Sequence, residues 1–160
     1  MIFDKDVPLG FEKPTDLPKD TMQRNKWQEK NRWWWENSPM RYDWKKEISF
    51  VEFSREFFQE IDKRFFSNVR KYMPWKKIFF DPLVNFEALS EKDVLEIGVG
   101  NGSHAQLLAR YCKSYTGIDI TNYAVKSTSE RMNCFGLKNA TIIRMDAERM
   151  QFPDNTFDYI

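Results

Sequence analysis

A short apolar run that leads into three glycines constrains the fold of this chain more than any other feature. The run covers residues 94–97, and Gly98, Gly100 and Gly102 follow it. Valine, leucine and isoleucine are typical of a parallel strand covered on both faces, and glycine lets the backbone approach a ligand that a side chain would block. A helix expected over residues 103–112 would point its first N–H groups into the same space. The pattern therefore predicts a small-molecule site at the end of a strand, suited to an anionic ligand group.

The sequence after Lys92 alternates between strand-like and helix-like segments. Strands are expected over residues 93–97, 115–120 and 141–145. Thr121 suits the N-cap of the helix between the second and third strands, and Gly136 suits the left-handed residue at its end. This alternation predicts the α/β fold class, with a Rossmann-like, doubly wound and mostly parallel sheet.

Residues 157–160 have the composition of the start of a fourth strand, which follows a turn at 153–156. A strand cut after its first residues leaves a parallel sheet without a neighbour, so we expect these 160 residues to be the front part of a longer protein. Because one sheet edge would stay open, we expect this chain alone to bind its ligand weakly or to aggregate.

Residues 1–88 lack the alternating pattern and predict a mostly helical extension in front of the sheet domain at 89–160. The opening of the chain, with Pro8, Pro14 and Pro18 among charged residues, indicates an irregular or mobile lead-in.

Two helices are expected within this extension. The first begins at a cap on Asp20 or Thr21 and ends at about Glu36. The second covers residues 51–72, where apolar side chains recur every four positions, and Pro74 ends it. The apolar stripe of the second helix must pack on another element.

Three acidic residues stand where successive strands end: Glu96, Asp119 and Asp146. Strand ends converge on one crevice in a doubly wound sheet, so three acids in register favour a shared site over three solvated loop residues. The two oxygens of Asp119 match a ribose diol, and this acid follows Gly98 at the spacing expected between a glycine turn and its ribose-binding acid. Asp146 is placed to accept from an adenine amino group, beside the backbone of Ala147.

The motifs that carry these residues, at 94–102, 116–119 and 146–158, resemble those of class I S-adenosylmethionine-dependent methyltransferases. The likeness covers about residues 92–160 and is strongest to the small-molecule branch related to quinone-biosynthesis methylases. It implies that the glycine loop approaches the methionine part of the cofactor and that Glu96 holds its amino end. It further implies that Asp119 binds the ribose and that Asp146 with Ala147 binds the adenine. The cofactor-binding set is thus Glu96, Gly98, Gly100, Gly102, Asp119, Ile120, Asp146 and Ala147.

The alternative of a dinucleotide-binding Rossmann protein fits less well. Its G-x-G-x-x-G fingerprint requires a third glycine where this chain has Ser103. S-adenosylmethionine carries an ammonium group that an acid at Glu96 would match, whereas a dinucleotide carries none. The resemblance therefore implies an enzyme that passes the sulfonium methyl to an unidentified small-molecule acceptor, with positioning and water exclusion as the main protein contribution.

No catalytic residue is assigned from the sequence. His104, the only histidine, falls in the first turn of the helix after the glycine loop and is expected to be a solvated helix residue. A general base must reach the acceptor as well as the cofactor.

The front end is basic and rich in tryptophan. Residues 19–46 hold eight basic and four acidic residues, and five of the six tryptophans. Aromatic side chains interleaved with Lys and Arg can stack bases and neutralise phosphates, so a nucleic-acid-binding module is one interpretation. A lid over the active site is the favoured one, because Trp27 and Trp34 share one helical face and the total charge is near zero.

The net charge of +1 argues against a polyanionic partner for the chain as a whole. The first residues carry charges instead of a signal-peptide core, and no apolar run approaches the roughly 18 residues of a spanning helix. Cys112 and Cys134 match no metal-ligand spacing. We therefore expect reduced thiols, no metal site and a cytoplasmic location.

Overall fold

A computed structural model describes residues 17–73 and 77–160. The chain divides into two compact units, one that ends at Met40 and one that covers Arg41–Ile160. The irregular lead-in around Pro8 and Pro14 and the helix stop at Pro74 lie outside the described residues. None of the helices in the described ranges is long and apolar enough to span a bilayer.

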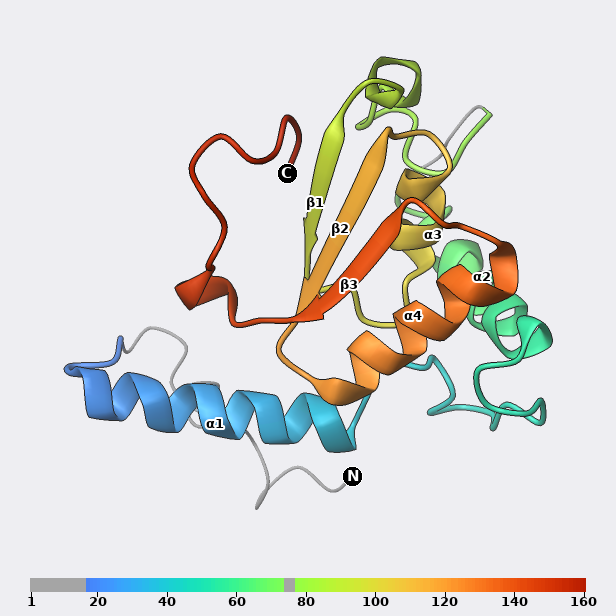
Figure 1. Ribbon diagram of the computed structural model, residues 1–160. Coiled ribbons are helices and arrows are strands. Elements are labelled where there is room, and N and C mark those ends of the chain that lie inside the picture. Colours follow the sequence, from blue (N-terminus) through green and yellow to red (C-terminus); the bar gives the residue numbers. More distant parts are fainter. Residues whose placement is uncertain (1–16, 74–76) are drawn as a thin grey trace. The chain divides into compact units, whose positions relative to one another are not determined.

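The first unit contains helix α1 (Thr21–Asn37) (Figure 1). Asp20 caps it, because its side chain accepts a hydrogen bond of 2.7 Å from the backbone N–H of Gln23. At the other end the N–H of Ser38 donates to the carbonyl of Trp34. The expected helix from Asp20 to about Glu36 is confirmed.

The second unit is built on three parallel strands, β1 (Asp93–Ile97), β2 (Ser114–Asp119) and β3 (Ala140–Arg144), in the order β1-β2-β3. Helices α3 (Ser103–Ala109) and α4 (Asn122–Phe135) connect them (Figure 1). The α/β, Rossmann-like fold class is confirmed. The second and third strands each begin one residue earlier than expected, and α3 ends before Cys112.

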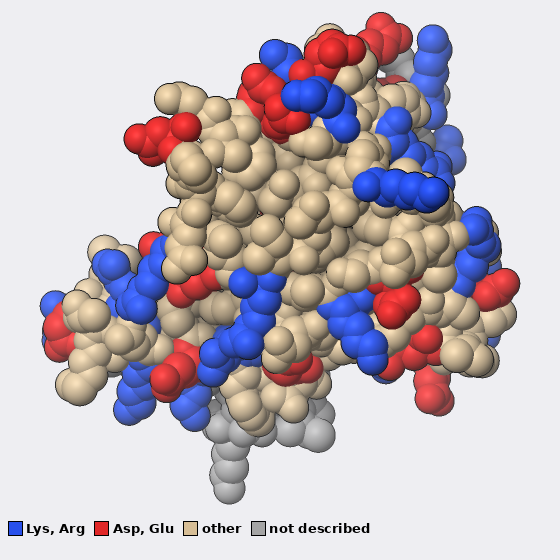
Figure 2. All heavy atoms as spheres, viewed as in Figure 1, with Lys and Arg blue, Asp and Glu red and all other residues tan. Residues whose placement is uncertain are grey.

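The ends of α4 form as the sequence predicts. The Thr121 hydroxyl accepts from the N–H of Ala124 at 3.2 Å, and Gly136 adopts a left-handed conformation with φ of 70°. Alanines and Met132 from α3 and α4 pack on Val94 and Tyr115 of the sheet. Figure 2 shows that the visible surface over the strands is mostly uncharged.

The expected fourth strand begins as a parallel bridge. Tyr159 pairs with Val94, and the N–H of Leu95 donates to the carbonyl of Tyr159 at 2.9 Å. Since β2 occupies the other edge of β1, residues 158–160 lie on the open edge of the sheet. Two short 3-10 helices, η1 (Phe86–Leu89) and η2 (Ala147–Arg149), precede β1 and follow β3.

Helix α2 (Arg55–Val69) begins four residues later and ends three residues earlier than the expected range of 51–72. Phe53 has φ of 65°, outside the helical region, and the Ser54 hydroxyl then caps the helix by accepting from the N–H of Phe57 at 3.2 Å. The buried side chains of α2 are Phe57, Phe58, Ile61 and Phe66, and the helix packs against α3 and α4.

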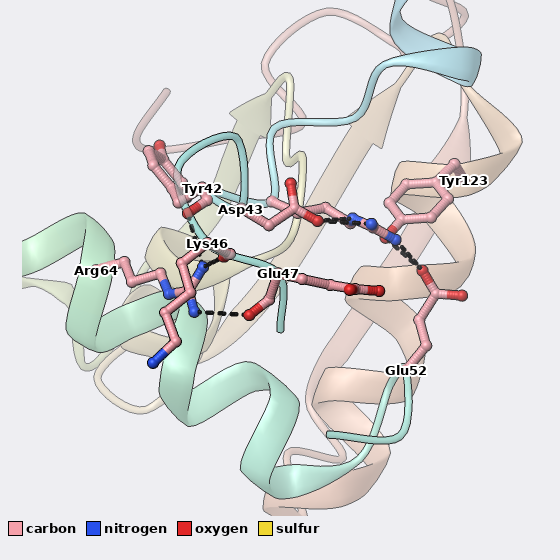
Figure 3. A network of polar contacts seen from close by, with 8 residues as sticks. Tyr42, Asp43, Lys46, Glu47, Glu52, Arg64 and Tyr123 are labelled. Carbon is pink, nitrogen blue, oxygen red and sulfur yellow. Dashed lines mark hydrogen bonds and ion pairs between the residues drawn. The ribbon is translucent and has the colours of Figure 1, made fainter. Parts of the chain in front are cut away.

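Residues 41–53, which have no regular secondary structure, are tied to α2 and α4 by polar side chains (Figure 3). Arg41 pairs with Asp43 at 2.6 Å and with Glu52 at 3.1 Å, and the Tyr123 hydroxyl of α4 donates to Glu52 at 2.9 Å. From α2, Arg64 donates to the main-chain carbonyls of residues 42, 46 and 47. This segment and α2 thus share a unit with the sheet, and the division expected near residue 88 stays a prediction.

A buried arginine joins three helices of this unit. Arg131 of α4 has a fully buried side chain, and its guanidinium lies 2.9 Å from both carboxylate oxygens of Asp62 on α2. It also donates to Gln106 of α3 at 3.0 Å and lies over the Phe58 ring. Burial lowers the pKa of Arg131 and the Asp62 charge acts in the opposite direction. The pair therefore compensates a charge that α4 could not otherwise bury.

We expect Asp62→Asn to lower the free energy of unfolding by about 3 kcal/mol, because it leaves the Arg131 charge buried without its partner. Urea denaturation followed by circular dichroism measures this loss. The matched control is Glu60→Gln on the same helix, where the partner is Arg64 at i+4, and we expect it to cost about 0.5 kcal/mol. Equal losses in the two variants would contradict the assigned role of the buried pair.

Candidate active site

The glycine loop follows β1 and has two kinds of glycine. Gly98, Gly100 and Gly102 all have positive φ, of 82°, 54° and 75°, which disfavours any other residue. A Cβ on Gly98 or Gly100 would meet nothing within 4 Å, so open space lies beside both. A Cβ on Gly102 would lie 2.9 Å from the Thr128 side chain and 3.2 Å from Cδ of Arg131. Gly102 is thus required by the packing of α3 on α4, and its contact with a cofactor stays a prediction.

Asp119 ends β2 directly beside this loop. Its Oδ2 accepts from the N–H of Gly100 at 3.2 Å, and its Oδ1 accepts from the N–H and hydroxyl of Thr121 at 2.9 and 2.8 Å. The carboxylate therefore links the glycine loop to the start of α4. The structure brings the loop and this acid together, as the sequence predicts.

The loop after β3 adjoins the same edge of the sheet. The N–H of Met145 donates to the carbonyl of Asp119 at 2.9 Å, and the carbonyl of Ile120 accepts from the Arg144 side chain at 3.3 Å. Asp146 caps η2 by accepting from the N–H of Glu148 at 2.9 Å. Asp146 and Ala147 thus stand on the neighbouring loop, although no hydrogen bond described for the Asp146 carboxylate reaches Asp119.

Glu96 is a largely buried acid on β1. Its side chain is 14 % exposed and accepts a hydrogen bond of 2.6 Å from the hydroxyl of Tyr115. Burial raises the pKa of Glu96 to about 7, the Tyr115 hydrogen bond lowers it, and the charge of Asp119 raises it. Near neutral pH this carboxyl is therefore partly protonated, and a cation placed beside it would favour the ionised form.

His104 lies beside Glu96 in an aromatic setting. Its Nδ1 is 3.8 Å from Oε1 of Glu96, and its ring packs edge-on against Phe65 and Phe80, with centroids 5.3 and 4.6 Å away. The side chain is 45 % exposed, yet Nε2 is buried, and no group within residues 17–73 and 77–160 hydrogen-bonds to it. Burial lowers the pKa of His104, and Asp62 opposes this. The expectation of a solvated histidine is only partly correct, because α2 and the segment at Phe80 cover the first turn of α3.

Sequence reasoning missed three residues that shape the site. Tyr115 reads as an ordinary strand residue, and only the pairing of Val94 with Tyr115 places its ring on the face that carries Glu96. Arg131 and Asp62 belong to no motif that would predict a role for either residue. For the buried pair, a charged residue at a core-facing helical position was the available signal.

Comparisons with known proteins agree with this geometry. Residues 94–160 match a family described as a methyltransferase domain. The chain is 39 % identical over 74 residues to phthiotriol/phenolphthiotriol dimycocerosates methyltransferase 1 of Mycobacterium ulcerans, covering 45 % of this chain and 26 % of that protein. It is 37 % identical over 71 residues to the fatty-acid O-methyltransferase of Mycolicibacterium smegmatis, covering 43 % of this chain and 25 % of that protein. The chain thus spans about a quarter of the length of these relatives.

A solved structure resembles this fold over most of the chain. The phosphoethanolamine N-methyltransferase 1 of Haemonchus contortus, in complex with phosphoethanolamine and S-adenosylhomocysteine, superposes with a TM-score of 0.54 at 16 % identity. That comparison covers 87 % of this chain and 25 % of the other. The fold and its loops define a Rossmann-like α/β domain. Within this domain, residues 94–160 are similar in sequence to methyltransferase domains.

Glu96 gives the site a pH dependence. Because its pKa in the folded protein, about 7, lies above the ordinary value of 4.5, the folded state binds more protons than the unfolded state between these values. Stability from this group is present below pH 4.5 and is lost as the pH rises through 7. The loss amounts to about 3 kcal/mol at most.

We therefore expect the unfolding free energy of the natural protein to fall relative to that of Glu96→Gln between about pH 5 and about pH 8. Urea denaturation at both pH values measures it. Glu87→Gln, which changes an exposed acid, serves as the control and should show no such trend. A difference independent of pH would contradict the raised pKa of Glu96.

Proposed function

We propose that this protein is an S-adenosylmethionine-dependent methyltransferase that transfers the sulfonium methyl to a small-molecule acceptor. The observation that carries the proposal is the hydrogen bond between Asp119 and Gly100, which places an acid beside the open glycine loop. The match of residues 94–160 to the methyltransferase domain supports it.

The residues present fit this cofactor. The open space beside Gly98 and Gly100 would receive the methionine part, and Glu96 would lie near its ammonium group. Asp119 would bind the ribose, Ile120 would line the same edge, and the loop of Asp146 and Ala147 would bind the adenine. When bound, the cofactor supplies an activated methyl group on sulfur.

The protein itself contributes binding, orientation and proton control. The ammonium group would lower the pKa of Glu96, so this carboxyl would release its proton on binding and become the counter-charge. The backbone of the glycine loop and the carboxylate of Asp119 are already joined, so the site is largely preorganised.

The acceptor class rests on the curated relatives. Their names give phthiotriol dimycocerosates and fatty acids as acceptors, which supports a small, lipid-like molecule over a nucleic acid. In this proposal the tryptophan-rich front end acts as a lid. The free thiols of Cys112 and Cys134 support a cytoplasmic location.

Titration with S-adenosylhomocysteine by calorimetry tests the proposal. We expect weak but measurable binding by this chain, and binding at least about tenfold weaker in Asp119→Asn, because a charged hydrogen-bond acceptor is worth about 1.5–3 kcal/mol. Glu91→Gln, an exposed acid in front of β1, is the matched control and should bind as the natural protein does.

A parallel titration with NAD distinguishes the dinucleotide alternative. Binding of NAD without binding of S-adenosylhomocysteine would overturn the proposed function. Equal affinities in Asp119→Asn and Glu91→Gln would remove Asp119 from the site.

A further inference from the structure

An apolar cavity of about 240 Å³ lies beside Glu96 and His104. Its walls come from the segment 80–86 before β1, from Leu107 and Leu108 of α3, and from Tyr159. Phe80 and Phe86 contribute rings on one side. Apart from the Tyr159 hydroxyl, Glu96 and His104 are the polar side chains of this lining. The cavity therefore has a hydrocarbon interior and one polar end.

The polar end has an unmet hydrogen-bonding requirement. Nε2 of His104 is buried, and nothing in the described parts of the chain hydrogen-bonds to it. Its Nδ1 is 3.8 Å from Oε1 of Glu96, too far for a hydrogen bond, and the other Glu96 oxygen already accepts from Tyr115. Burial lowers the pKa of His104, which favours the neutral imidazole with an acceptor nitrogen. Nε2 has almost no accessible surface, so a ligand in the cavity does not reach it. Oε1 of Glu96 accepts from no described group and belongs to a side chain that is 14 % exposed, so a ligand hydroxyl can donate to it.

Size and charge limit what such a ligand is. An apolar cavity of roughly 150 Å³ already holds benzene, so 240 Å³ accommodates a larger ring or a short hydrocarbon chain. An ionised head group would give up its water with no fixed cation in the lining to replace it. The cavity therefore favours an uncharged molecule.

The cavity also lies close to the proposed cofactor position. Glu96 lines the cavity, and it stands two residues before Gly98 with the charge of Asp119 acting on it. A ligand in the cavity and a cofactor in the glycine loop would thus approach the same carboxyl from two directions.

We propose that this cavity binds the methyl acceptor, and that the acceptor is an uncharged hydroxyl compound with an apolar body whose hydroxyl hydrogen-bonds to Oε1 of Glu96. The identification of this ligand as the methyl acceptor rests on the proposed function, whereas the binding site itself rests on the cavity alone.

Calorimetric titration with 1-octanol and with octanoate tests the binding site without any cofactor. We expect octanol to bind and octanoate to bind at least fivefold more weakly, since the two differ mainly in head-group charge. Absence of octanol binding, or equal binding of octanoate, would overturn the proposal.

Two variants locate the site, with one matched control. Val84→Trp fills the cavity and should abolish octanol binding, whereas Val51→Trp makes the same change at an exposed position outside it and should not. Glu96→Leu keeps a side chain of similar size but removes Oε1, and we expect octanol to bind about 2–10-fold more weakly. Glu96→Leu keeps the test decisive if Val84→Trp does not fold, because unchanged octanol affinity in this variant would refute the hydrogen bond.

S-adenosylhomocysteine separates this inference from the proposed function. Octanol should bind to protein saturated with S-adenosylhomocysteine as well as to the protein alone. Competition between the two ligands would show that the cavity belongs to the cofactor site and would overturn the acceptor assignment. If S-adenosylhomocysteine does not bind while octanol does, the proposed function fails and the apolar binding site remains.

Discussion

The buried charge of Arg131 is the constraint on which the helical layer depends. A guanidinium with no exposed surface requires a carboxylate, and Asp62 on α2 provides it at 2.9 Å. The same carboxylate accepts from the hydroxyl of Ser103 at 2.6 Å, at the first residue of α3. Helix α2 is therefore part of the domain that carries the glycine loop. Glycine is also required at position 102, because a Cβ there would press on the Arg131 side chain.

The edge of the sheet where β1, β2 and β3 end places the candidate site. Parallel pairing brings the ends of neighbouring strands together, and the backbone there is further joined by hydrogen bonds from Gly98 and Met145 to the carbonyls of Ile118 and Asp119. The acid of β2 then reaches the glycine loop without a long side chain. Glu96 differs from Asp119 because it faces the helical layer, where burial and Tyr115 control its proton.

Local sequence signals predicted the elements that depend on local interactions. The caps at Asp20 and Thr121 and the left-handed Gly136 were all foreseen, because each acts within a few residues of its own helix. The parallel sheet followed from the alternation of segments. The start of α2 was missed by four residues, since Phe53 leaves the helical region just before the cap at Ser54.

Interactions between distant residues could not be predicted in the same way. The contact of Arg131 with Asp62 and that of Tyr115 with Glu96 depend on how α2 and β2 meet their neighbours. The surroundings of His104 depend on Phe65 and Phe80, which come from two separate segments. The composition of the glycine loop thus indicated where a ligand would bind. The protonation of Glu96 and His104 could be inferred only from the packed structure.

The attachment of residues 41–53 has a mechanical consequence. Glu52 is bound by Tyr123, which stands four residues after Asp119 in the first turn of α4. If this segment were to swing outward, it would either lose the bond to Tyr123 or pull that turn with it. A displacement that keeps this bond would move the first turn of α4, and the hydrogen bonds of Thr121 with Asp119 would carry the movement to the end of β2.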